Sequence, residues 1–98
     1  MTINKERNNA NLTLTLEGRL DTTTAPDLEK VINEETGDIK ELVLDMNKLE
    51  YISSAGLRVL LAAQKKMAKA GTMKLIGVCD EVMEVFEITG FVDILTIE

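Results

Sequence analysis

The sequence predicts an α/β fold: a mixed, mostly parallel β-sheet of four to five strands covered by three to four short α-helices. Short apolar runs typical of strands alternate with segments of helical periodicity, and strands separated by helices imply right-handed crossovers and parallel neighbours. The 98 residues contain 45% hydrophobic and 29% charged residues, no repeat and no linker. This is the size and balance of one globular domain, which we expect to span residues 1–98.

The N-terminal part predicts two antiparallel strands. Thr2–Glu6 is a short strand, and Asn8–Asn11 has the composition of a turn. From Leu12 to Leu20 the residues alternate, with Leu12, Leu14 and Leu16 on one face, as in a half-buried strand.

The first helix is expected to follow Thr24. The Thr24 hydroxyl is placed to cap it, with Pro26 in the first turn and Asp27 three residues beyond the cap. Its apolar stripe contains Leu28, Val31 and Ile32, and Gly37 ends it.

The central segment predicts a strand buried on both faces over Lys40–Met46, because Leu42, Val43 and Leu44 are consecutive. Asn47–Ile52 is expected to be a connection. A second helix is expected over Ser54–Ala70, ended by Gly71. Its apolar stripe consists of Leu57, Leu60, Leu61, Ala63, Met67 and Ala70.

The C-terminal part predicts a buried strand over Thr72–Val78, a short helix capped by Asp80 and ended before Gly90, and a last strand over Val92–Glu98.

Composition excludes several classes of function. A net charge of −6 disfavours binding to nucleic acid or to an anionic membrane. The chain has no histidine and one cysteine, Cys79, so a Ser-His-Asp triad, a histidine or cysteine-cluster metal site and an internal disulfide cannot form. We expect no enzyme activity, metal or cofactor, and we expect Cys79 to be a small buried hydrophobe. No signal peptide or apolar span is visible, which predicts a cytoplasmic protein.

Ser53 and Ser54 are expected at a strand-to-helix junction near the carboxyl edge of the sheet. They can act as helix caps, each worth about 1 kcal/mol. A nucleophile is disfavoured because Ile52 breaks the G-x-S-x-G pattern and no histidine can serve as base. A phosphoacceptor is physically sound: phosphate adds about −1.5 to −2 charges, which the positive end of the helix dipole tolerates but a partner docked there would not.

Three segments resemble the STAS domain family of anti-sigma factor antagonists. LDMNKLEYISSAGLRVLLAAQKKM resembles the central motif, LEGRLDTTTAPDLEKVI is similar to the G-x-L-D segment and first helix, and KLIGVCDEVMEVFEITGFVDIL resembles the closing strand, helix and T-G turn. They occur in the family's order and together cover nearly the whole chain.

The resemblance implies a bacterial regulator of transcription that works by partner switching. Such a protein binds an anti-sigma factor that is also a serine kinase and thereby frees a sigma factor. The kinase phosphorylates the antagonist and releases it, and a serine phosphatase of the PP2C type resets it. A stand-alone monomer that binds neither nucleic acid nor membrane is expected.

The resemblance also assigns residues. The acceptor precedes the motif glycine by two positions, which is Ser54, with Ser53 as the alternate where the family often has Asp. Partner contacts are expected from Asp21, Thr22, Thr23, Ser53, Ser54, Ala55 and Arg58. Asp21 can equally be a loop or capping acid, and Arg58 a solvated helix charge. Structural roles are expected for Asp45, which can bond loop amides, for Gly56, and for Leu57 in the core.

Two other interpretations of the function stay open. One is a constitutive STAS interaction module, such as a stress-signalling scaffold or a lipid-transport subunit, in which the serines only cap the helix. The other is an enzyme or nucleotide-binding protein, against which the absent histidines and the absent phosphate-binding loop count.

Overall fold

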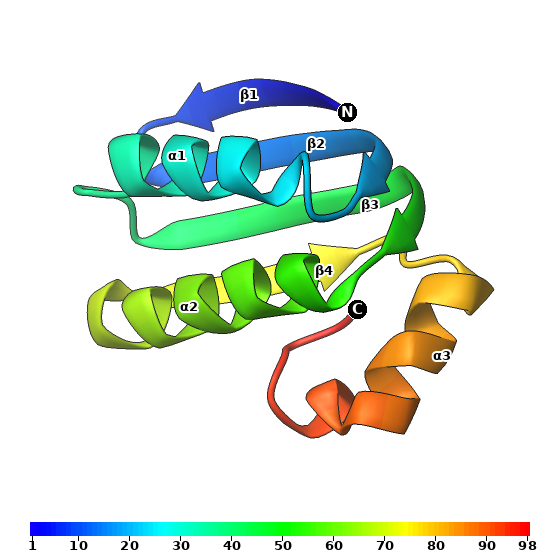
Figure 1. The fold of residues 1–98 in the computed structure, drawn as a ribbon. Coiled ribbons are helices and arrows are strands. Elements are labelled where there is room, and N and C mark those ends of the chain that lie inside the picture. Colours follow the sequence, from blue (N-terminus) through cyan, green and yellow to red (C-terminus); the bar gives the residue numbers. More distant parts are fainter.

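The computed structural model describes residues 1–98 as one α/β fold with a four-stranded sheet in the order β1-β2-β3-β4 (Figure 1). The strands are β1 (Thr2–Asn8), β2 (Asn11–Leu20), β3 (Glu41–Ile52) and β4 (Thr72–Ile76). β1 is antiparallel to β2, whereas β2, β3 and β4 are mutually parallel. The predicted mixed, mostly parallel sheet is confirmed.

Three α-helices accompany the sheet. Helices α1 (Ala25–Glu35) and α2 (Ser54–Ala70) lie side by side against one face of it, and α3 (Asp80–Thr89) lies at an angle to them beyond β4 (Figure 1). A short 3₁₀ turn, η1 (Phe91–Asp93), follows α3. The side-by-side packing brings the beginnings of α1 and α2 to the same end of the sheet.

The core lies between the sheet and these helices. Leu12, Leu14 and Leu16 are buried, as their alternation predicts. Most of the predicted α2 stripe is buried too, although Leu61 is only half-buried and Ala70 is exposed at the last turn. Leu57 is 8% exposed and packs in the core, as expected.

The expected connection over Asn47–Ile52 is wrong, because β3 continues as a strand to Ile52. The pairing with β2 shifts between Thr15 and Glu17 and again between Gly18 and Arg19, and β3 carries an extra residue at each point. Beyond Asp45, β3 pairs with β2 only. The bulges therefore carry the end of β3 away from β4 and along β2, straight into Ser53.

The expected final strand is also wrong. Val92–Glu98 contains the last two residues of the 3₁₀ turn and forms a single parallel bridge, between Leu75 and Ile97. β4 ends at Ile76, two residues before the predicted end. Cys79, not Asp80, occupies the N-cap position of α3, and Cys79 is half-buried where full burial was expected.

The predicted cap of α1 is half right. Thr24 occupies the N-cap position, but its side chain makes no capping hydrogen bond. Its hydroxyl instead donates to the Arg19 carbonyl at 2.8 Å and accepts from the Asp21 N–H at 2.8 Å. The Thr24 hydroxyl was expected to cap the helix, but it bonds instead to the loop that precedes the helix. The helix itself ends at Glu35, before Gly37.

Candidate functional site

Two strand-to-helix junctions meet at the carboxyl edge of the sheet. Leu20 ends β2, Ile52 ends β3, and the two are register partners. The Ser53 N–H donates to the Leu20 carbonyl at 2.9 Å. The segment after β2, which holds Asp21, Thr22 and Thr23, and the two serines after β3 are therefore neighbours, as the parallel topology requires.

The loop between β2 and α1 is organised by Asp21. Its Oδ1 accepts hydrogen bonds from the Thr23 hydroxyl at 2.8 Å, the Thr23 N–H at 3.0 Å and the Thr24 N–H at 3.2 Å. These bonds, the Thr23 hydroxyl first, lower the pKa of the Asp21 carboxyl. This bonding is that of a loop acid, while Thr22 and Thr23 stay exposed.

A stacked pair beside this loop was not foreseen from the sequence. The Arg19 guanidinium lies 4.1 Å from the centre of the Tyr51 ring, in the range of a cation–π contact. Arg19 Nε is also 3.9 Å from the Asp21 carboxylate. The residues are partners across β2 and β3 only because of the second bulge, which a strand pattern alone does not reveal.

The two serines have different surroundings. Ser53 is the N-cap of α2, half-buried, and its Oγ accepts a long hydrogen bond of 3.4 Å from the Gly56 N–H. Ser54 is the first residue of the helix, exposed, and its hydroxyl makes no hydrogen bond within the chain. The capping interpretation therefore fits Ser53, and Ser54 is left chemically accessible.

Gly56 is structurally required where the two junctions touch. A Cβ atom added there would lie 2.8 Å from Leu20 Cγ and 2.8 Å from Ile52 Cγ1, both on buried side chains. Ala55, beside it, is half-buried against the core. The close approach of α2 to the two strand ends depends on this absent side chain, which gives Gly56 the expected structural role.

Asp45 lies in β3 at the first of its two bulges, opposite Thr15 of β2 and several residues before the two serines. Its Oδ1 accepts from the Asn47 N–H at 3.0 Å and from the Asn47 side-chain amide at 2.8 Å. Asp45 therefore bonds amides as expected, but they belong to Asn47 within β3 and not to a loop, and the bonds stabilise the bulge in the strand.

A shallow groove of 210 Å³ runs between the first turns of α1 and α2. It brings together three of the predicted contact residues, Thr22, Ala55 and Arg58. Its other lining residues are Ala25, Pro26, Glu29 and Val59. Arg58 is exposed and forms no ion pair within the chain.

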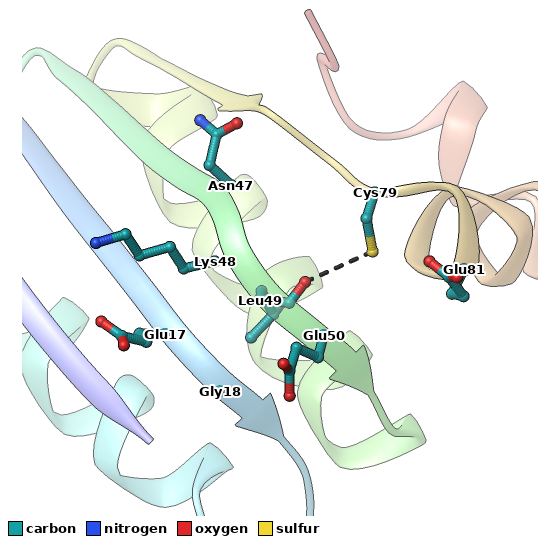
Figure 2. Close-up of a pocket in the computed structure, with 8 residues that line it drawn as sticks. All are labelled: Glu17, Gly18, Asn47, Lys48, Leu49, Glu50, Cys79 and Glu81. Atoms are coloured by element: carbon teal, nitrogen blue, oxygen red, sulfur yellow. Dashed lines mark hydrogen bonds between the residues drawn. The ribbon is translucent and has the colours of Figure 1, made fainter.

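A larger, open pocket of 830 Å³ lies elsewhere, between the bulged half of β3 and the start of α3 (Figure 2). Its lining residues are Glu17, Gly18, Asn47, Lys48, Leu49, Glu50, Cys79 and Glu81. The Cys79 thiol donates to the Leu49 carbonyl at 3.5 Å. Three carboxylates against one lysine make it a poor site for a phosphate, and none of the predicted site residues lines it.

No three acidic or cysteine side chains gather closely enough to hold a metal ion. None of the helices combines the length and apolar character needed to cross a lipid bilayer.

The sequence has curated relatives. It is 32% identical over 98 residues to the anti-sigma-B factor antagonist of Listeria monocytogenes, covering 96% of this chain and 84% of the relative. It is 44% identical over 59 residues to BtrV of Bordetella bronchiseptica, whose name reads "Putative anti-sigma factor antagonist". That match covers 59% of this chain and only about half of the relative, 51% of its length.

The structure resembles solved anti-sigma factor antagonists. It superposes on one from Mycobacterium paratuberculosis with a TM-score of 0.88 and 25% identity, over 98% of this chain and 83% of the other. It shares its fold with phosphorylated SpoIIAA of Bacillus, with a TM-score of 0.77 and 18% identity, over 99% and 91% of the two chains. The family model described as STAS domain matches residues 2–98. The chain therefore belongs to the STAS domain family.

Proposed function

We propose that this protein is an anti-sigma factor antagonist whose binding to a serine-kinase anti-sigma factor is switched off by phosphorylation of Ser54. The observation that carries the proposal is the exposed, unbonded Ser54 hydroxyl at the first residue of α2. The names of the Listeria and Mycobacterium relatives support the antagonist role, and the phosphorylated SpoIIAA shows that a protein of this fold accepts a phosphate. The protein is a cytoplasmic monomer and a binding module without a catalytic role.

The docking surface of the unmodified protein comprises the two junctions and the groove between the helices. Its members are Asp21, Thr22, Thr23, Ser53, Ser54, Ala55 and Arg58. The groove supports this assignment because it joins Thr22 from one junction to Ala55 and Arg58 from the other. A partner seated there covers the Ser54 hydroxyl, so binding and phosphorylation involve the same surface.

The modification is a phosphoryl transfer from ATP bound to the kinase. A bond forms between Ser54 Oγ and the γ-phosphorus, and the bond from that phosphorus to the bridging oxygen of the β-phosphate breaks. ADP leaves, and the hydroxyl proton passes to a base on the kinase. A PP2C-type phosphatase reverses the change by hydrolysing the ester, which restores the hydroxyl and releases inorganic phosphate.

The phosphate acts through charge. It adds about −1.5 to −2 charges beside the positive end of the α2 dipole, so the fold tolerates it without rearrangement. The chain already carries −6, and a partner shaped to this acidic protein meets a dianion in the middle of its contact surface. Charge repulsion then releases the partner, together with the cost of removing water from a phosphate that gains no cationic partner across the interface.

The experiment is intact mass analysis after incubation with ATP and, in turn, each small serine-kinase anti-sigma factor of the source genome, followed by peptide mapping. We expect one phosphate on Ser54, none in Ser54→Ala, and still one phosphate in the matched variant Ser53→Ala. We expect Ser54→Asp to weaken binding to that kinase by about 100-fold, as repulsion of a few kcal/mol implies.

A stable complex that forms with no phosphorylation by any kinase would reject the switch. It would favour a constitutive interaction module, for which the hydrogen bond of Ser53 to Gly56 is the supporting observation. In that case Ser54→Asp would leave partner binding unchanged.

A further inference from the structure

Two arginines lie near the serines, and only Arg19 has a side-chain partner within the chain. Arg19 stacks on Tyr51 at 4.1 Å and lies 3.9 Å from the Asp21 carboxylate. Arg58 is exposed on the wall of the groove and pairs with no carboxylate within the chain. The guanidinium of Arg58 is therefore available to an incoming anion, whereas that of Arg19 is held by its neighbours.

The position of Arg58 relative to Ser54 is set by the helix. The two residues are four apart on α2, and both are exposed. Residues at this spacing have Cβ atoms about 5–6 Å apart on one face. Helical side chains lean toward the N-terminus, so the long Arg58 side chain can reach the turn that begins with Ser54.

The carboxylates of the groove and of the loop before α1 leave Arg58 free to turn to a phosphate. Glu29, on α1, lines the same groove but forms no ion pair with Arg58. Asp21, in the loop before α1, is committed to the hydroxyl and amides of Thr23 and Thr24. A phosphate dianion on Ser54 carries more charge than either carboxylate, and a guanidinium binds it with two parallel hydrogen bonds.

We propose that Arg58 receives the phosphate carried by Ser54, so that phosphorylation withdraws a free guanidinium from the docking surface as well as adding negative charge to it. The inference rests on the proposed modification of Ser54 and names the residue that responds to it. In the unmodified protein the same guanidinium is free to pair with a carboxylate of the partner. One modification thus removes an attractive contact and creates a repulsive one.

The test needs no kinase. Phosphoserine is inserted at position 54 during synthesis, and the second pKa of the phosphate is measured by ³¹P NMR titration. A nearby cation favours the dianion, so Arg58→Gln is expected to raise this pKa by about 0.3 unit, the size of an i,i+4 ion pair. Arg58→Lys retains the charge and is expected to restore most of the shift. The Arg58 Nε–H signal of the wild type is expected to move with the same titration.

The matched control is Lys65→Gln. Lys65 is exposed on α2, seven residues beyond Arg58 and on nearly the same face, so it removes the same charge about 10 Å further along the helix. We expect it to leave the phosphate pKa unchanged. An unchanged pKa in Arg58→Gln, or equal shifts in both variants, would overturn the proposal and leave the phosphate to the helix N–H groups.

The two proposals can fail separately. If no kinase phosphorylates Ser54 but Arg58→Gln raises the phosphate pKa, the switch fails and the Arg58 contact stands. If a kinase phosphorylates Ser54 and the pKa does not respond to Arg58, the switch stands and the role of Arg58 is rejected.

Discussion

The β2–α1 junction and the β3–α2 junction lie side by side, yet they are built in opposite ways. After β2, Asp21 gathers the hydroxyl of Thr23 and the amides of Thr23 and Thr24, so its polar groups are used within the loop. After β3, the Ser53 hydroxyl makes one long hydrogen bond and the Ser54 hydroxyl makes none. The first junction is closed around the Asp21 carboxylate, and the other offers a free hydroxyl at a helix N-terminus.

The difference shows how a small domain can carry a modifiable residue without loss of order. The closed junction is bonded to the open one through the Ser53 N–H and Leu20 carbonyl, and the close packing at Gly56 locks α2 to both strand ends. Ser54 is therefore displayed on a fixed frame while its own hydroxyl contributes no bond to that frame. A phosphate placed there changes the surface and leaves the frame intact.

The largest expected effect comes from disturbing the contact between the junctions. Gly56→Ala places a Cβ atom 2.8 Å from two buried side chains, which must move. We expect the free energy of unfolding to fall by about 1–3 kcal/mol, as for other overpacked sites. Chemical denaturation with a two-state fit measures this change.

Gly37→Ala is the matched control for that experiment. A Cβ atom at Gly37 meets nothing within 4 Å, and its φ is not in the left-handed region. We expect it to change stability by less than about 0.5 kcal/mol. Equal losses in the two variants would show that the packing at Gly56 does not hold the junctions together.

The fold was largely predictable because its signals are local. The alternation of Leu12, Leu14 and Leu16 and the helical stripe of α2 each follow from residues close in the chain, and the order of elements then requires a parallel sheet. The second half of β3 was missed because Asn47, Lys48 and Glu50 are polar and exposed. Its strand form depends on pairing with β2 and on bulges, which the local pattern does not specify.

The site was predictable as a set of residues but not as an arrangement. Ser53 and Ser54 look alike in the sequence, and only the structure separates the capping hydroxyl from the free one. The stacking of Arg19 on Tyr51 depends on a register shift, and the groove beside Arg58 depends on the packing of α1 against α2. Each of these is a tertiary relation between segments distant in the chain.

The next effect in size separates the two serines. Ser53→Ala removes the capping oxygen of α2, and because the bond is long we expect a loss near the lower end of the usual range, about 0.5 kcal/mol. Ser54→Ala removes no intramolecular bond and places a better helix former at the first helical position. We expect it to leave stability unchanged or slightly raised. Thermal unfolding of the pair measures the difference, and a larger loss in Ser54→Ala would contradict the assignment of the cap.

The smallest expected effect tests the closed junction through its pH dependence. The pKa of Asp21 is lowered in the folded protein, mainly by the Thr23 hydroxyl, so its ionised form stabilises the fold above the unfolded-state pKa of about 3.9. That contribution is lost as the pH falls through the lower, folded-state pKa. Asp21→Asn keeps an oxygen acceptor but cannot ionise, so wild type should exceed it in stability near neutral pH and converge with it in acid.

Asp38, whose pKa is lowered by its hydrogen bond with Arg7, titrates in both proteins, so its contribution cancels in the difference between them. Urea denaturation from pH 7 down to acid measures the gap between the two proteins. A gap that did not shrink would show that the loop is held by the shape of the Asp21 side chain rather than by its charge.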